Sequence, residues 1–207
     1  MNHLIIFAHP NGQGNEPKSL NHSILKQVIL ASENVGAETI VRDLYALNFQ
    51  AILSQQEIQA SFQGIIAVEI QQEQELIKQA DLITLIYPLW WMGFPAILKG
   101  YLDRVLTYGF AYKTEGGASV GLLSSKKMQH FATLGNSYEK YENLGFIQSL
   151  QDCLVNGLFN FCGITDIQQC FFGEVYAKNN EEIAQLLQQV FAQTQQNLIS
   201  LVENVNE

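Results

Sequence analysis

The 207-residue chain has little positive charge. It carries 11 Lys and Arg against 20 Asp and Glu, which gives a formal net charge of −9. Proteins that bind nucleic acid normally present a basic surface, so this balance argues against that class. An acidic surface is also common in proteins that need it only for solubility. We therefore expect no nucleic-acid partner.

Long apolar runs and a targeting segment are lacking as well. The chain begins MNHLIIFAHP, with no basic stretch ahead of a short apolar run, unlike a secretory signal peptide. No run approaches the ~20 apolar residues that cross a bilayer. The sequence predicts a soluble, cytoplasmic protein without membrane insertion.

Cysteine is scarce, with only Cys153, Cys162 and Cys170. Their odd number and wide spacing fit neither a disulfide framework nor a CxxC metal site. We expect reduced thiols in the core, in a reducing compartment. The four histidines show no HExxH or comparable ligand spacing, so no metal site is expected.

The signature motifs of several enzyme classes are also missing. The chain has no GxSxG of an α/β-hydrolase and no GxxxxGK[ST] of a P-loop NTPase. Its first loop holds Gly12 and Gly14 but not GxGxxG, which counts against a standard dinucleotide-binding dehydrogenase.

What the chain does contain is a regular alternation of apolar runs and amphipathic segments. The apolar runs predict strands at residues 3–8, 38–43, 81–87, 127–133 and 167–172. Helical spacing, capping residues and a proline predict helices that begin near Ser19, Ser54, Gln71, Ala96, Phe146 and Asn180.

This alternation predicts a single α/β domain over residues 1–207, with a parallel sheet covered by helices on both faces. Two doubly wound folds agree with it, the dinucleotide-binding Rossmann fold and the flavodoxin-like fold. In both, ligands bind beyond the carboxyl ends of the strands. The loops after the first, third and fourth strands are therefore the candidate site.

The first of these loops ends in Ser19-Leu20-Asn21 at a predicted helix start. Free backbone N–H groups and the positive end of the helix dipole suit a phosphate there. The simpler alternative is that Ser19 only caps the helix, and composition alone favours it.

The second loop contains two adjacent tryptophans within Pro88-Leu89-Trp90-Trp91-Met92. An aromatic side chain in a loop suits a flat heteroaromatic ligand, although a hydrophobic dimer interface explains it as well. The two interpretations are compatible if the site lies at that interface. The third loop, Thr133-Leu134-Gly135-Asn136-Ser137-Tyr138, is small and polar and lets a ligand approach closely.

The run from Tyr87 to Val105, YPLWWMGFPAILKGYLDRV, resembles a known family. Shorter matches are Ala8-His9-Pro10, Phe110-Ala111-Tyr112 and Phe161-Cys162-Gly163. Together they are similar to the flavodoxin-like NAD(P)H:quinone oxidoreductases, the DT-diaphorase-like family, in its short bacterial form. The resemblance implies a flavodoxin-like three-layer sandwich with a five-stranded parallel sheet in the order 2-1-3-4-5.

The resemblance also implies a function. It predicts a homodimer with the site at the interface, where Phe110-Ala111-Tyr112 covers the partner's flavin. Hydride would pass from NAD(P)H through FMN, or alternatively FAD, to a quinone in two-electron ping-pong turnover. Catalytic roles fall to Trp91 and Tyr138. The cofactor-binding positions are His9, Ser19, Leu20, Asn21, Pro88, Leu89, Trp90, Trp91, Met92, Thr133, Leu134 and Gly135.

The chain departs from the family at one place that bears on chemistry. Vertebrate members carry a Tyr and a His after the third loop. Tyr138 or Tyr141 matches the Tyr, but the His position falls near Phe146, and no His follows His130. A non-catalytic role therefore stays open: a flavin-binding regulatory partner of a transporter, of the potassium-efflux ancillary type, with little turnover.

Overall fold

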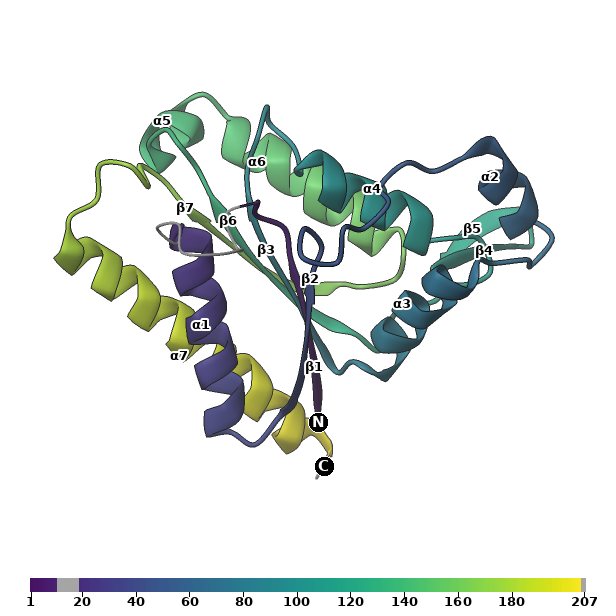
Figure 1. Cartoon of the computed structure of the whole chain (residues 1–207), viewed down its shortest axis with the longest axis horizontal. Helices are drawn as coiled ribbons and strands as arrows, with labels where there is room; N and C mark the ends of the chain where they lie inside the picture. Colours follow the sequence, from purple (N-terminus) through teal and green to yellow (C-terminus); the bar gives the residue numbers. More distant parts are fainter. Residues whose placement is uncertain (11–18, 206–207) are drawn as a thin grey trace.

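A five-stranded parallel sheet forms the centre of the computed structural model, which describes residues 1–10 and 19–205 (Figure 1). The strand order is β2-β1-β3-β6-β7. Since β6 and β7 are the fourth and fifth strands of this sheet, the predicted order 2-1-3-4-5 is confirmed. The strands are β1 (Asn2–Phe7), β2 (Glu38–Asp43), β3 (Leu82–Pro88), β6 (Lys127–Thr133) and β7 (Asp166–Phe172).

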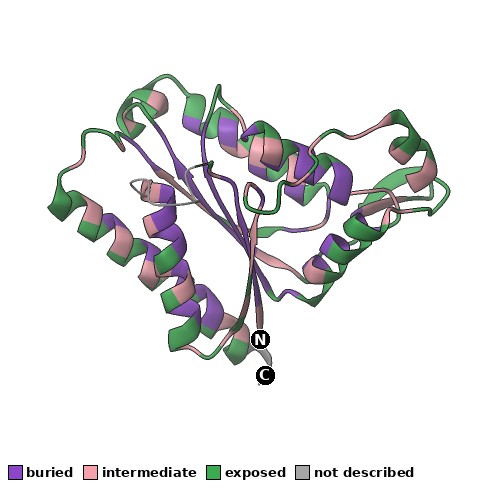
Figure 2. Cartoon of the chain, in the orientation of Figure 1, coloured by how far each residue is buried: buried purple, intermediate pink, exposed green. Residues whose placement is uncertain are grey.

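Helices cover both faces of the sheet, as predicted. On one face, α1 (Leu20–Asn34) packs beside α7 (Asn180–Val205). The opposite face is covered by α3 (Val68–Gln79), α4 (Ala96–Val105) and the helical segment from Phe146 to Asn160. The three central strands β1, β3 and β6 are the most deeply buried layer between the two sets of helices, whereas the edge strands β2 and β7 are partly exposed (Figure 2).

The alternation of side chains along β1 separates the two cores. Leu4 and Ile6 pack into the core beneath α3 and α4, whereas Ile5 and Phe7 pack into the core beneath α1 and α7. Successive side chains of a strand point to opposite faces, so a strand with both faces covered must be apolar throughout. This requirement explains why β3 is buried along its whole length.

Several elements differ from the sequence-based expectation, among them α5 (Tyr138–Asn143), which was not predicted. The helix expected at 146–161 is α6 (Phe146–Leu150) followed by a π-helical segment, η1 (Gln151–Asn160). A hairpin of β4 (Tyr112–Glu115) and β5 (Ala118–Gly121) was not predicted. Its strands are short and largely exposed, so they lack the apolar run of a buried strand.

Two short helices complete the structure. A capping box between Ser54 and Glu57 opens α2 (Gln55–Ser61), as predicted, and α5 (Tyr138–Asn143) follows the third loop. The expectation of core thiols is wrong for Cys153, which is exposed, while Cys162 is buried. No helix in the described ranges is long and apolar enough to cross a membrane.

Buried polar side chains join the sheet to α1 through His3. The Ser32 hydroxyl donates to the Val28 carbonyl, so it accepts from His3 Nδ1 at 2.6 Å. Thr84 Oγ1 lies 2.6 Å from His3 Nε2 and accepts from Gln129 Nε2. The neutral imidazole satisfies all these groups, and burial lowers the pKa of His3 to about 3. Burial lowers the pKa of His130 to about 3 as well.

These two histidines predict an acid-sensitive fold. Below a pH of about 6.5 the unfolded chain binds protons at His3 and His130 that the folded chain does not bind. Stability should therefore fall as pH falls from 6.5 towards 3, by up to ~1.4 kcal/mol per pH unit for each histidine. Guanidinium unfolding at pH 7, 6 and 5 measures this slope before most carboxylates titrate.

The matched variant is His3→Gln, which keeps hydrogen-bonding groups near Ser32 and Thr84 but cannot titrate. We expect it to be less stable at pH 7 and to show a shallower slope between pH 6.5 and 5. A slope identical to that of the unchanged protein would contradict the assignment.

Candidate functional site

The three candidate loops meet at the carboxyl edge of the sheet. The sheet order reverses between β1 and β3, where ligands of such sheets bind. The Leu89 N–H donates to the Thr133 carbonyl at 2.8 Å, which joins the second and third loops. The Leu134 N–H donates to the Phe172 carbonyl at 2.8 Å, which joins the third loop to the end of β7.

Ser19 stands at the N-cap of α1 but does not cap the helix. Its side chain makes no capping hydrogen bond, and its Oγ lies 3.2 Å from His9 Nδ1. The first turn of α1 carries no acidic residue, so no carboxylate opposes the positive helix end. The arrangement therefore favours the anion-binding interpretation over simple capping. Gly12 and Gly14 lie outside the described residues.

Asn21 connects the first loop to the third. It is buried, and its Nδ2 donates to Thr133 Oγ1 at 2.8 Å. Its Oδ1 has no hydrogen-bond partner among the described residues. A buried acceptor without a donor costs ~1–3 kcal/mol, so a ligand that offers an N–H or O–H group here would recover that cost. The unsatisfied Asn21 Oδ1 therefore favours a polar ligand at this place.

His9 faces the second loop from the end of β1. Its ring centroid lies 6.4 Å from that of Trp90. Burial, and to a lesser extent the nearby His22, lowers the pKa of His9 below its usual value. His22 itself is buried and packs edge-on against Phe7 at 5.0 Å. His9 is therefore neutral at pH 7 and presents a hydrogen-bonding group without a charge.

A tight turn leaves the tryptophans of the second loop exposed to solvent. Trp90 and Gly93 exchange backbone hydrogen bonds of 3.1 and 3.0 Å. Between them, Trp91 and Met92 have φ values of 49° and 60°, the left-handed conformation of a type I′ turn. This conformation costs non-glycine residues ~1–2 kcal/mol each. The turn leaves the Trp91 side chain 100% exposed.

A pocket of about 280 Å³ lies between the second and third loops. The volume is close to the lower limit for small-molecule sites. The structure thus brings together most residues predicted for the cofactor ring. The lining consists of Pro88, Leu89, Trp90, Trp91, Thr133, Leu134, Gly135, Asn136, Tyr141, Val175 and Tyr176.

Not every predicted residue lies in this lining. The residues that do not line it are His9, Ser19, Leu20, Asn21 and Met92. Of these, Asn21 is connected to it by its bond to Thr133, and His9 by its contact with Trp90.

The predicted Tyr138 does not line the pocket, whereas Tyr141 does. Burial raises the pKa of Tyr138, and Glu142 raises it further. Both tyrosines lie on α5, and three positions along a helix bring a side chain back to nearly the same face. The sequence offered both candidates, but only the placement of α5 relative to the loop separates them. Val175 and Tyr176 were missed, because the loop after the fifth strand carries no motif.

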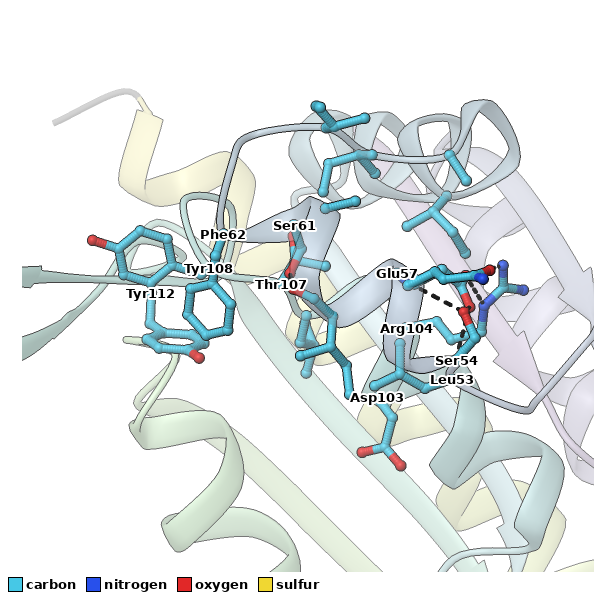
Figure 3. A pocket seen from close by; sticks show the side chains of 18 residues that line it. Leu53, Ser54, Glu57, Ser61, Phe62, Asp103, Arg104, Thr107, Tyr108 and Tyr112 are labelled. Carbon is cyan, nitrogen blue, oxygen red and sulfur yellow. Dashed lines mark hydrogen bonds and ion pairs between the residues drawn. The ribbon is translucent and has the colours of Figure 1, made fainter.

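A second, larger pocket of about 420 Å³ lies between α2, α3, α4 and the β4 hairpin. Figure 3 shows Phe62, Tyr108 and Tyr112 on one side of it. On the other side Arg104 Nε donates to Glu57 at 2.8 Å (Figure 3). This pocket is remote from the candidate loops, since α2 and α5 lie at opposite ends of Figure 1.

Comparison with known proteins decides the family. A family model described as having a flavodoxin-like fold matches residues 1–197. The chain belongs to this family. The chain is 50% identical over 203 residues to an "Uncharacterized NAD(P)H oxidoreductase" of Haemophilus influenzae, a match that covers 98% of both proteins. The resemblance carried by Tyr87 to Val105 is therefore confirmed, and the Rossmann alternative is excluded.

Further relatives are named oxidoreductases. The "Ribosyldihydronicotinamide dehydrogenase [quinone]" of Homo sapiens is 34% identical over 184 residues, which cover 77% of this chain and 76% of that protein. The solved NAD(P)H:quinone oxidoreductase from Methanothermobacter marburgensis superposes with a TM-score of 0.82 at 27% identity, covering 94% and 96% of the two chains. The chain is accordingly an oxidoreductase of this family.

Proposed function

We propose that this oxidoreductase uses a bound flavin to carry two electrons at a time from NAD(P)H to quinones or similar acceptors. The observation that carries the proposal is the pocket itself. It lies at the carboxyl edge of the sheet, between the exposed Trp91 side chain and the small third loop. A flat aromatic ring system fits between such walls, and the uncapped start of α1 suits its phosphate.

The residues fit a flavin at both ends. Ser19, Leu20 and Asn21 would hold the phosphate end, with the unsatisfied Asn21 Oδ1 able to accept from a hydroxyl of the cofactor chain. The second and third loops would hold the ring. We propose FMN, with FAD as the alternative.

The protein's part in the reaction is placement and exclusion of water. A bound flavin supplies the hydride chemistry that no side chain of the chain can supply. Trp91 offers an open aromatic side chain against which a nicotinamide, and after its departure a quinone, would stack in turn. Because the nicotinamide and the quinone would occupy the same place in turn, we expect ping-pong kinetics. Tyr141 brings a hydroxyl to the pocket lining, where it can donate to an oxygen or nitrogen of the ligand.

The first test is the visible spectrum of the purified protein. We expect flavin absorption near ~450 nm that bleaches on anaerobic addition of NADPH or NADH, because the cofactor accepts the hydride. The flavin released by denaturation identifies FMN or FAD. A protein that binds neither flavin would refute the proposal. Bound flavin that neither nucleotide bleaches would instead favour the regulatory role.

Trp91→Ala should separate function from folding. Because the side chain is 100% exposed, its loss should leave Tm unchanged. Loss of a stacking partner should lower kcat/KM for the acceptor roughly 3- to 10-fold. Trp91→Phe, which keeps a ring, should retain most of the activity. A parallel fall in Tm and activity would show that Trp91 serves packing instead.

We also propose that a second copy of the chain covers the larger pocket. Phe62 and Ile65 line it and are each 62% exposed, which gives an apolar surface of the kind that marks interfaces. Tyr112 lines the same pocket. Phe110 and Ala111 are buried in their own chain, so of that predicted covering segment only Tyr112 is placed to reach a partner.

Sedimentation should therefore find a dimer that Ile65→Asp weakens, because the new charge would have to be buried at the interface. The matched control is Ile199→Asp on α7, at a site 43% exposed and on the other side of the sheet. A monomeric unchanged protein, or equal effects of both substitutions, would contradict this interface.

A further inference from the structure

The connection between β7 and α7 carries an aromatic side chain that the proposed chemistry has not used. Tyr176 lines the pocket of the second and third loops, yet it is 90% exposed. A tyrosine this open makes little contact with its own chain. Exposed aromatics beside a pocket are typical of ligand contacts.

The backbone that carries Tyr176 is held firmly against the third loop. The Glu174 N–H donates to the Asn136 carbonyl at 2.9 Å, and the Val175 N–H donates to the Leu134 carbonyl at 3.3 Å. A Cβ at Gly173 would lie 2.5 Å from the Tyr138 nitrogen, so only glycine allows this approach. Tyr176 is therefore positioned by the fold and is not part of a loose loop.

The strand order sets Tyr176 across the pocket from Trp91. Trp91 follows β3 and Tyr176 follows β7, with β6 and its third loop between them. Two strand spacings place the ends of β3 and β7 about 10 Å apart, comparable with a fused three-ring system. Gly135 lines the same pocket, and a Cβ there would lie 3.7 Å from Tyr176 Cε2.

We propose that Tyr176 is the second aromatic wall of the flavin pocket and contacts the bound cofactor from the β7 side. The inference rests on the proposed flavin dependence and goes beyond it by assigning a cofactor contact outside the three predicted loops. Tyr176 acts by holding the cofactor, so its replacement should change the affinity for the flavin and not the affinity for the acceptor.

The test is titration of FMN into flavin-free protein, for the unchanged chain and for Tyr176→Ala, Tyr176→Phe and Lys178→Ala. We expect Tyr176→Ala to raise the Kd for FMN roughly 3- to 10-fold at unchanged Tm, because a ring contact is lost. Tyr176→Phe keeps the ring and should keep the Kd. Lys178→Ala, on the same connection, should also leave the Kd unchanged.

Other outcomes overturn the proposal. An unchanged Kd in Tyr176→Ala, alone or with a raised KM for the acceptor, removes Tyr176 from the cofactor site while the flavin proposal stands. A loss in Tyr176→Phe as large as in Tyr176→Ala rejects the ring contact. If the unchanged chain binds neither FMN nor FAD, the flavin proposal fails and this inference fails with it.

Discussion

Burial of the parallel sheet on both faces is the constraint on which the rest of the structure depends. Leu4 and Ile6 fill one core and Ile5 and Phe7 fill the other, so the strands have no face left for chemistry. Free backbone groups and unpacked side chains can gather only where the strands end. The backbone bonds from Leu89 to Thr133 and from Leu134 to Phe172 then join the second loop, the third loop and the end of β7 into one surface.

That rigid edge also explains how strain is tolerated at Trp91 and Met92. Two adjacent non-glycine residues in the left-handed region are costly, and they persist only where the surroundings fix them. Here the paired backbone bonds between Trp90 and Gly93 close the turn, and β3 behind it is buried throughout. The gain is an aromatic side chain that points away from the core. The structure thus gives up stability at the point where the proposed ligand would stack on an open aromatic surface.

The sequence was most informative where burial imposes a pattern. The strands of the sheet, the capping box at Ser54 and the sheet order follow from apolar runs and family resemblance. The sequence was least informative where tertiary packing decides which element forms or which side chain reaches the pocket. The exposed β4 hairpin has no core-facing pattern, although Gly116 and Gly117 with positive φ mark its turn. Likewise, the choice between Tyr138 and Tyr141 depends on how α5 is set against the third loop, which no local pattern encodes.

The absence of the family's histidine gives the site an unusual electrostatic character. Phe146 stands in that region and packs edge-on against Tyr141 at 5.8 Å. His3 and His130 are buried and have pKa values of about 3, and partial burial lowers the pKa of His9. Tyr141 and Tyr176 are the tyrosines in the described lining. The described lining contains no Asp, Glu, Lys, Arg or His, so charge that develops on the proposed ligand would be met by hydroxyl and backbone donors.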